Sequence, residues 1–460
     1  MLKKNVLEGL IEVLMCGGGD FADLYLEKSR SLNIVLENRK IEKITSGERL
    51  GLGMRVLYKD RTYFAFTEDL NIGAMEQLAR ALASRETASI QNHVNPRAMQ
   101  IGDGSSLYRN ALDRGSLAEK VAGLNGMNEA AWKEPGNLSQ LTLIYGETEK
   151  DVWIMNSKGV YVHEGRPRVK TIAQGVFGKD GIVQSTYESM GALGDYGFIR
   201  QADLGGFVEN LMNRGEGLLR AEEAPSGTMP VVISGEAGGT MVHEACGHGL
   251  EADIVEKGMS VYGGKIGEKV ASELITVVDD GTIRGRYGSG FFDDEGTKTK
   301  ENILIEKGVL KGYMSDLLSA SKLGLAPSGN GRREDYRSAP ITRMTNTYIA
   351  KGQSRPEDVV ASVDRGLFVR KMGGGQVNTA TGDFVFEVSE GFLIEGGKLG
   401  RQVRGATLIG NGPDVLNRID MVAADFGYSL GTCGKDGQGV PVADGQPTLR
   451  IPNLVVGGTK

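Results

Sequence analysis

The sequence predicts an α+β protein of two domains: an N-terminal antiparallel sheet with helices over residues 1–222, and a mostly β half over residues 223–460. The chain has 460 residues, more than one hydrophobic core usually supports. Glycine accounts for 68 of them, about twice the usual share of about 7%, which indicates many tight turns between strands. In the first half, short segments of alternating apolar and polar residues stand between segments of helical period.

The elements of the first half follow from these periods. Apolar residues three or four positions apart predict an amphipathic helix over 3–15, which the glycines at 17–19 end. An antiparallel meander is expected next, with strands at 22–27, 32–37, 40–45, 52–58 and 62–66. Helices are predicted at 70–84, 116–133 and 201–219, and further strands at 138–146, 151–155 and 170–176.

The second half begins where Pro225 and Gly227 follow the last of these helices. A strand is predicted at 229–233, so the boundary between the two domains is placed between residues 222 and 223. A helix over about 236–250 is expected to pack on the β-rich remainder of the chain.

Charge and cysteine content narrow the classes of function and location. The formal net charge is −6 and no dense block of Lys and Arg occurs, which argues against direct nucleic-acid binding. The 3 cysteines argue against a disulfide framework and suit a reducing cytoplasm. Glu8 and Glu12 interrupt the apolar run that a signal peptide needs, and no apolar run approaches the roughly 18 residues of a membrane span. A cytoplasmic protein without a membrane segment is expected.

The segment HEACGH, from His243 to His248, gathers the residues of a metal site in a chain with only 4 histidines. Two imidazoles suit zinc, and Glu244 could take a proton from a zinc-activated water. The histidines are five positions apart, which places them about 140° apart on a regular helix. We therefore predict a widened turn of the π type, which brings both imidazoles to one face and which Gly247 makes sterically possible.

A catalytic zinc usually has three protein ligands, so the motif lacks one. Cys246 lies between the histidines, where its thiol can hardly point the same way as both, and is expected to pack in the core. Cys433 is favoured instead, because its glycine-rich loop can approach a metal closely and Lys435 could stabilise its thiolate. Glu251 and Asp253 are the candidates if Cys433 is not a ligand.

Other polar residues have plainer interpretations. Glu251 is expected to be a solvated surface acid, with orientation of an imidazole as the alternative. His93 and His163 have no partner at ligand spacing and are expected to be structural. The acidic runs 279–280 and 293–295 border glycines and are predicted to be turns between strands rather than a second metal site. Ordinary partly buried histidines or a closed structural zinc site are the alternatives for the motif itself.

Longer segments carry a resemblance to a known family. The runs HEACGHGLEAD, GGGQVNTATGDF and CGKDGQGVPV, at 243–253, 373–384 and 433–442, resemble the TldD branch of the TldD/PmbA family, also called modulators of DNA gyrase. Segments at 22–27, 36–38 and 51–56 resemble the opening domain of the same family, so the similarity spans essentially the whole chain.

This resemblance implies a metallopeptidase in which His243, His248 and Cys433 hold a zinc ion and Glu244 is the catalytic glutamate. The sister branch, PmbA or TldE, resembles the same fold without the metal motif and commonly pairs with the catalytic branch. The chain is therefore expected to be the catalytic subunit of a dimer, either with a motif-less paralogue or with a second copy of itself.

One segment of the sequence is a candidate for binding a peptide substrate. An extended peptide along a sheet edge gains main-chain hydrogen bonds without demanding a sequence. Candidate wall residues of such a cleft, with an ordinary strand as the alternative, are Gln376, Val377, Asn378 and Thr379. The expected function is a zinc-dependent metallopeptidase for unfolded or short peptides. The alternatives are a non-catalytic regulator stabilised by a closed four-ligand zinc site and a metal-dependent hydrolase of non-peptide amides or esters.

Overall fold

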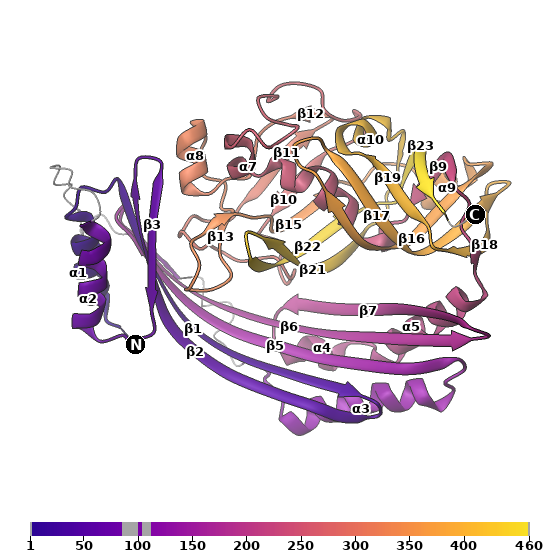
Figure 1. Cartoon of the computed structure of the whole chain (residues 1–460), viewed down its shortest axis with the longest axis horizontal. Helices are drawn as coiled ribbons and strands as arrows, with labels where there is room; N and C mark the ends of the chain where they lie inside the picture. The colour runs from indigo at the N-terminus through magenta and orange to yellow at the C-terminus, as the bar shows by residue number, and fades with distance from the viewer. Residues whose placement is uncertain (1, 85–99, 104–111, 459–460) are drawn as a thin grey trace.

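The computed structural model describes residues 2–84, 100–103 and 112–458 (Figure 1). The first half of the chain forms a long curved sheet, and the second half forms a β-rich body that lies against it. The predicted mixture of helices and strands is confirmed. Among the described residues, none of the helices has both the length and the apolar composition needed to cross a membrane.

The N-terminal sheet has the strand order β3-β2-β1-β5-β6, with β4 and β7 both paired to β6. Its strands are β1 (Phe21–Glu37), β2 (Lys40–Tyr58), β3 (Arg61–Thr67), β4 (Gln100–Asp103), β5 (Leu138–Asn156), β6 (Val160–Lys179) and β7 (Ile182–Leu193). The predicted antiparallel order of the meander is confirmed, but its strand count is wrong. Segments 40–45 and 52–58 both lie in β2, segments 138–146 and 151–155 both lie in β5, and β4 and β7 are additional. Segments 22–27 and 32–37 form one strand because β1 is paired on both sides, so its ladder continues through the polar residues between them.

Within the described residues of this half, five helices cover the sheet in two groups. They are α1 (Lys4–Met15), α2 (Ile72–Ala83), α3 (Leu117–Lys133), α4 (Tyr196–Gln201) and α5 (Leu204–Arg220). The first two pack together over β1 and β2, and their apolar faces close one core. The other three pack over β5 and β6 and close a second core. The predicted helices at 3–15, 70–84, 116–133 and 201–219 are thereby confirmed, with α5 starting a few residues late at the cap Asp203.

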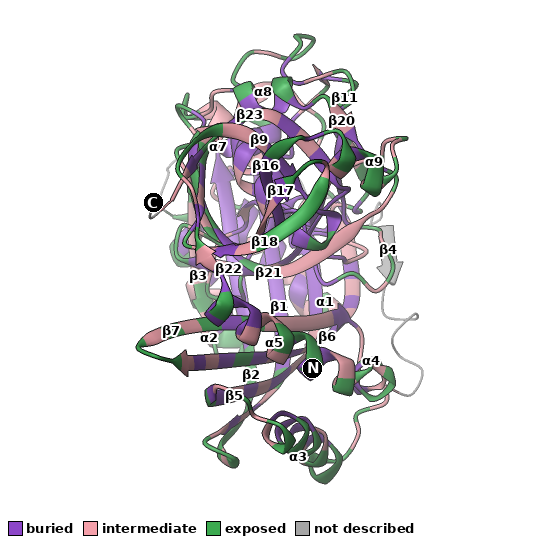
Figure 2. Cartoon of the chain, turned by 90° about the vertical axis from the view of Figure 1, so that its right-hand side faces the viewer, coloured by how far each residue is buried: buried purple, intermediate pink, exposed green. Residues whose placement is uncertain are grey.

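The C-terminal half contains a closed ring of strands, β16-β9-β23-β19-β17, because β17 pairs with β16 as well. Ring strands are β9 (Gly227–Ile233), β16 (Arg365–Val377), β17 (Asp383–Glu395), β19 (Thr407–Asn411) and β23 (Leu449–Gly457). Attached to the ring are β8 (Glu222–Glu223), β18 (Lys398–Arg404) and β20 (Met421–Val422). Buried positions gather along the central strands of this half (Figure 2). The predicted domain boundary at 222/223 falls inside β8, and both residues of β8 pair with β18 of the C-terminal half. The division at 222/223 therefore stays a prediction.

A second sheet of this half has the order β12-β11-β10-β15-β22-β21. Its strands are β10 (Val277–Asp280), β11 (Glu301–Glu306), β12 (Val309–Leu310), β15 (Asn346–Ile349), β21 (Gly427–Lys435) and β22 (Gln438–Gln446). A short pair, β13 (Gly331–Arg332) and β14 (Ile341–Thr342), stands apart. Short helices complete the half: α7 (Ala252–Glu256), α8 (Leu317–Leu323), α9 (Pro356–Ala361) and α10 (Gly412–Arg418).

The predicted turn at 279–280 is wrong. Asp279 and Asp280 end strand β10, and Asp279 is fully buried. Its carboxylate accepts hydrogen bonds from the backbone and side chain of Thr345, from Thr347 and from Asn330, which together replace the lost water. An acid that the chain can satisfy in this way has no need of a solvated turn.

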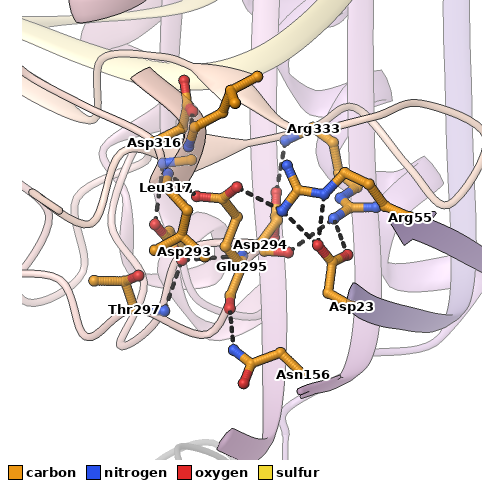
Figure 3. Close-up of polar contacts among 12 residues, drawn as sticks. Asp23, Arg55, Asn156, Asp293, Asp294, Glu295, Thr297, Asp316, Leu317 and Arg333 are labelled. Atoms are coloured by element: carbon orange, nitrogen blue, oxygen red, sulfur yellow. Dashed lines mark hydrogen bonds and ion pairs between the residues drawn. The ribbon is translucent and has the colours of Figure 1, made fainter. Parts of the chain in front are cut away.

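Buried ion pairs join the two halves (Figure 3). Arg55 of β2 binds Asp23 of β1 and, at 2.7 Å, Glu295 of the C-terminal half, and all three side chains are at most 1% exposed. Arg333 of the C-terminal half reaches back to Asp23 at 3.2 Å. The acidic run 293–295 does lie in a turn, as predicted, but the turn is buried against the N-terminal sheet.

Candidate metal centre

The predicted helix over 236–250 is a series of short turns. A 3₁₀ turn (Gly235–Ala237), α6 (Thr240–Val242), a π turn (His243–Gly247) and a second 3₁₀ turn (His248–Leu250) follow one another. The backbone N–H of His248 donates to the carbonyl of His243, which is i to i+5 geometry. The predicted widening is confirmed, and the two imidazole centroids lie 4.9 Å apart at nearly a right angle.

Gly247 is required here for close approach rather than for an unusual backbone. Its φ of −52° and ψ of −58° are helical. A Cβ at this position would lie 2.3 Å from the sulfur of Met344, which is fully buried. Our expectation that glycine eases a backbone distortion therefore needs correcting, because the constraint comes from packing on a neighbouring segment.

Cys433 enters from β21, almost two hundred residues further along the chain. Its Sγ lies 3.2 Å from Nε2 of His243 and 3.4 Å from Nε2 of His248. The three ligand atoms all lie within 4.8 Å of one another. Zinc at tetrahedral angles, with bonds of about 2.0–2.1 Å to nitrogen and about 2.3 Å to sulfur, separates N from S by about 3.6 Å. The donor set and its spacing therefore fit such an ion.

A carboxylate stands behind each imidazole. Nδ1 of His243 donates to Asp444 at 2.8 Å, and Nδ1 of His248 donates to Glu251 at 2.9 Å. Each hydrogen bond places the proton on Nδ1 and leaves Nε2 free to face Cys433, an arrangement typical of metal-bound histidine. Glu251 is fully buried, so the expectation of a solvated acid is wrong and the alternative role of orienting an imidazole fits. Asp444 is not among the predicted residues, because no local pattern in the sequence gives a signal for it.

Lys435 does not act on the thiol as we expected. Its ammonium binds Glu251 and Asp253 instead, which fixes the ion pairs beside His248. Burial alone would raise the pKa of the Cys433 thiol, but hydrogen bonds from His243 and His248, whose imidazoles are protonated on Nε2 as well in the metal-free protein, lower that pKa to about 5. Cys433 is therefore available as a thiolate at neutral pH.

Glu244 differs from the other acids of the cluster. It is half-buried, and no other residue in the described part of the chain forms a hydrogen bond or ion pair with its carboxylate. Burial raises its pKa above the ordinary value, against the charges of His243 and His248. Cys246 turns away from the cluster, with its Sγ 3.3 Å from the carbonyl of Val242 in the hydrophobic core, as predicted.

The remaining predicted residues lie outside this cluster. Gln376 and Val377 end β16, whereas Asn378 and Thr379 lie in the turn before β17, where Thr379 accepts a hydrogen bond from the backbone of Val261. His163 stacks on Trp153 with ring centroids 4.3 Å apart, which suits its predicted structural role. His93 falls outside the described residues.

Three models of one family match the chain in succession. They are described as the PmbA/TldA metallopeptidase domain 1, over residues 22–86, the central domain, over 112–223, and the C-terminal domain, over 226–458. The last of these matches contains every residue of the cluster around His243.

Named relatives extend over nearly the whole chain. A metalloprotease TldD homolog of Haemophilus influenzae is 36% identical over 469 residues, covering 100% of this chain and 97% of its own. A metalloprotease of Methanothermobacter thermautotrophicus is 34% identical over 96% of each chain. A zinc metalloprotease TldD homolog of Saccharolobus solfataricus is 28% identical and covers 96% of this chain and 97% of its own.

Solved structures agree in fold. The crystal structure of TldE from Thermococcus kodakarensis matches with a TM-score of 0.75 at 20% identity, covering 98% of this chain and 100% of that one. Family models along most of the chain and full-length relatives above 30% identity lead to the same assignment. The chain belongs to the TldD/PmbA family of metallopeptidases.

Proposed function

We propose that this chain is a zinc-dependent metallopeptidase that hydrolyses unfolded or short peptides, with His243, His248 and Cys433 as ligands and Glu244 as general base. The observation that carries the proposal is the convergence of two Nε2 atoms and one Sγ within 4.8 Å, with a carboxylate behind each imidazole. Among the described residues, these three are the only group of His, Cys, Asp or Glu so arranged, which favours an open catalytic site over a closed four-ligand one.

When bound, zinc acts as a Lewis acid and lowers the pKa of a water ligand to about 7. Asp444 and Glu251 hold the tautomers in which both histidines offer Nε2, and the acidity of Cys433 makes its thiolate available. Glu244 accepts a proton from the attacking water on a carboxylate oxygen and passes it to the leaving nitrogen. Its lack of a partner among the described residues supports this role, since no ion pair has to break first.

We further propose where the peptide binds, what the chain pairs with and where it is located. The segment from Gln376 to Thr379 forms one wall of the peptide cleft, and the active unit is a dimer with a motif-less paralogue or with a second copy. The relation to TldE in fold supports the first arrangement. A cytoplasmic location is supported by the 3 free thiols, Cys16, Cys246 and Cys433.

A peptide-pool assay tests the function. Purified protein, alone and mixed with a motif-less paralogue, is incubated with an unfolded peptide pool while zinc content is measured. Hydrolysis that a chelator stops and zinc restores is the expected result. Stoichiometric zinc without hydrolysis of any peptide would indicate the zinc-stabilised regulator. Turnover of simple amides or esters with no cleavage of peptides would indicate the non-peptide hydrolase.

Replacing Cys433 with Ser is expected to weaken zinc retention sharply, because a soft thiolate is exchanged for a neutral hydroxyl. The loss of affinity should exceed the about 10–100-fold that follows removal of an outer hydrogen-bond partner of a ligand. Zinc competition with a chelating dye measures it. Cys246→Ser is the matched control, since that thiol is buried in the core and is expected to leave zinc binding intact. Unchanged zinc affinity in the Cys433 variant would overturn the ligand assignment.

Replacing Gly247 with Val is expected to reduce zinc affinity by a larger free energy than it reduces fold stability. The new side chain meets Met344, and overpacking of this kind costs about 1–3 kcal/mol. The turn has to shift to relieve this contact, and because His248 is the next residue, its imidazole moves out of line with that of His243. Zinc titration and denaturation of the metal-free variant give the two quantities. Wild-type zinc affinity together with a loss of stability would contradict the expected link between turn and metal.

A further inference from the structure

Lys435 occupies a buried position between the two segments that supply the ligands. Its side chain is 8% exposed, and its Nζ donates to Glu251 at 3.0 Å, to Asp253 at 2.7 Å and to the carbonyl of Thr342 at 2.9 Å. All three donor positions of the ammonium are therefore used. None of these acceptors belongs to a ligand, so the lysine acts on the centre only through another residue.

We propose that Lys435 is a positioning residue for His248, acting through Glu251. Oε2 of Glu251 accepts hydrogen bonds from both Lys435 and Nδ1 of His248, so one oxygen atom joins the ammonium to the imidazole. The inference rests on the proposed function, because the orientation of Nε2 of His248 matters only if the cluster binds a metal.

The position of Lys435 on β21 gives this contact a second consequence. Cys433 lies two residues earlier on the same strand, and alternate residues of a strand point to the same face. One short stretch of β21 thus supplies the thiolate directly and holds the second imidazole indirectly. The distance between Cys433 and His248 is set on both sides by the same strand.

Glu251 needs this cation. The carboxylate is fully buried, and its Oε1 has no hydrogen-bond partner among the described residues. Without Lys435, only the imidazole N–H of His248 would remain on Oε2, and the buried charge would lose the ammonium that lies 3.0 Å from it. The carboxylate would then be free to rotate, and the ring of His248 with it.

The test is a double-mutant cycle on the full chain, with Lys435→Met, Glu251→Gln and the double variant. Zinc affinity is measured by dye competition, and cobalt(II) spectra report the geometry of the ligand set. Lys435→Met is expected to lower zinc affinity by about 10–100-fold, as loss of outer partners of metal ligands does, and to change the cobalt spectrum. Because the lysine acts through Glu251, the double variant should lose little more than Glu251→Gln alone.

A matched control separates this role from simple stabilisation. Lys322 also binds a carboxylate at 3.0 Å, that of Glu256, but lies at the surface, and Lys322→Met is expected to leave zinc affinity unchanged. If Lys435→Met lowers the melting temperature while the folded protein keeps wild-type zinc affinity and cobalt spectrum, the lysine is only structural and the inference is wrong. Additive losses in the cycle would also overturn it. Failure of the wild-type chain to bind zinc would instead refute the proposed function. If Lys435→Met does not fold, the double variant, in which Glu251 is neutral and only Asp253 loses its cation, is compared with Glu251→Gln.

Discussion

Glu244→Gln is expected to abolish most peptide hydrolysis while zinc stays bound. A glutamine can still accept a hydrogen bond from water but cannot take its proton, and loss of a general base typically costs about 10²–10⁴-fold in rate. The three ligand atoms belong to other residues, and no described residue relies on the Glu244 carboxylate as a partner. Turnover number and zinc content of the purified variant are the two measurements.

Turnover and zinc content together distinguish the possible roles of Glu244. Loss of stoichiometric zinc would show that Glu244 holds the centre together rather than moving a proton. Retained turnover with zinc present would assign the base to another group. Glu236→Gln is a suitable control, because that exposed acid lies on the 3₁₀ turn just before the π turn and takes no part in the cluster.

Arg55→Met is expected to destabilise the protein by about 3–5 kcal/mol, the range found when one partner of a buried ion pair is removed. The change leaves Asp23 and Glu295 without the guanidinium that lies between them, in a region where no side chain of the three is more than 1% exposed. Methionine has a similar length, so the loss of packing volume is small. Chemical denaturation followed by fluorescence and circular dichroism measures the effect.

Arg114→Met provides the comparison. Arg114 binds Glu149 through two hydrogen bonds of 2.7 and 2.8 Å, but its side chain is 58% exposed. Pairs at such a surface contribute about 0–1 kcal/mol, since water and salt already screen the charges. Equal losses of stability in the two variants would mean that burial adds nothing to the Arg55 pairs.

The widened turn is predictable from spacing alone, because a straight helix cannot aim His243 and His248 at one ion. The carboxylates that accept hydrogen bonds from those imidazoles are not predictable in this way. Asp444 lies 201 positions from His243, and long-range contacts bring it there: the pairing of β22 with β15 and a backbone hydrogen bond from Gly239 to Asp444. Glu251 is three residues from its partner, yet Lys435, the cation that pairs with its buried carboxylate, comes from β21. Local patterns carry no information on such distant strand pairings.

The same limit explains the errors in the fold. The sequence between residues 27 and 32 is polar and predicts an interruption, whereas neighbours on both sides of β1 keep its backbone paired. The local sequence around Asp279 is typical of a turn, but Thr345 and Thr347 donate hydrogen bonds to its carboxylate. In both cases a long-range contact satisfies groups that, taken locally, call for water.

The segment from Arg333 to Arg343 bears on how the molecule comes apart. Tyr336 is fully buried against Gly51 and Gly53 of the first sheet, while Arg343 donates to the backbone carbonyl of Cys433. This segment therefore contacts both the first sheet and the β21–β22 hairpin, which carries Cys433. Separating the two halves would expose the ring of Tyr336 and at the same time disturb the position of Cys433. The two domains predicted from the sequence should therefore unfold together, in one calorimetric transition. The C-terminal half alone is not expected to fold into a catalytic unit.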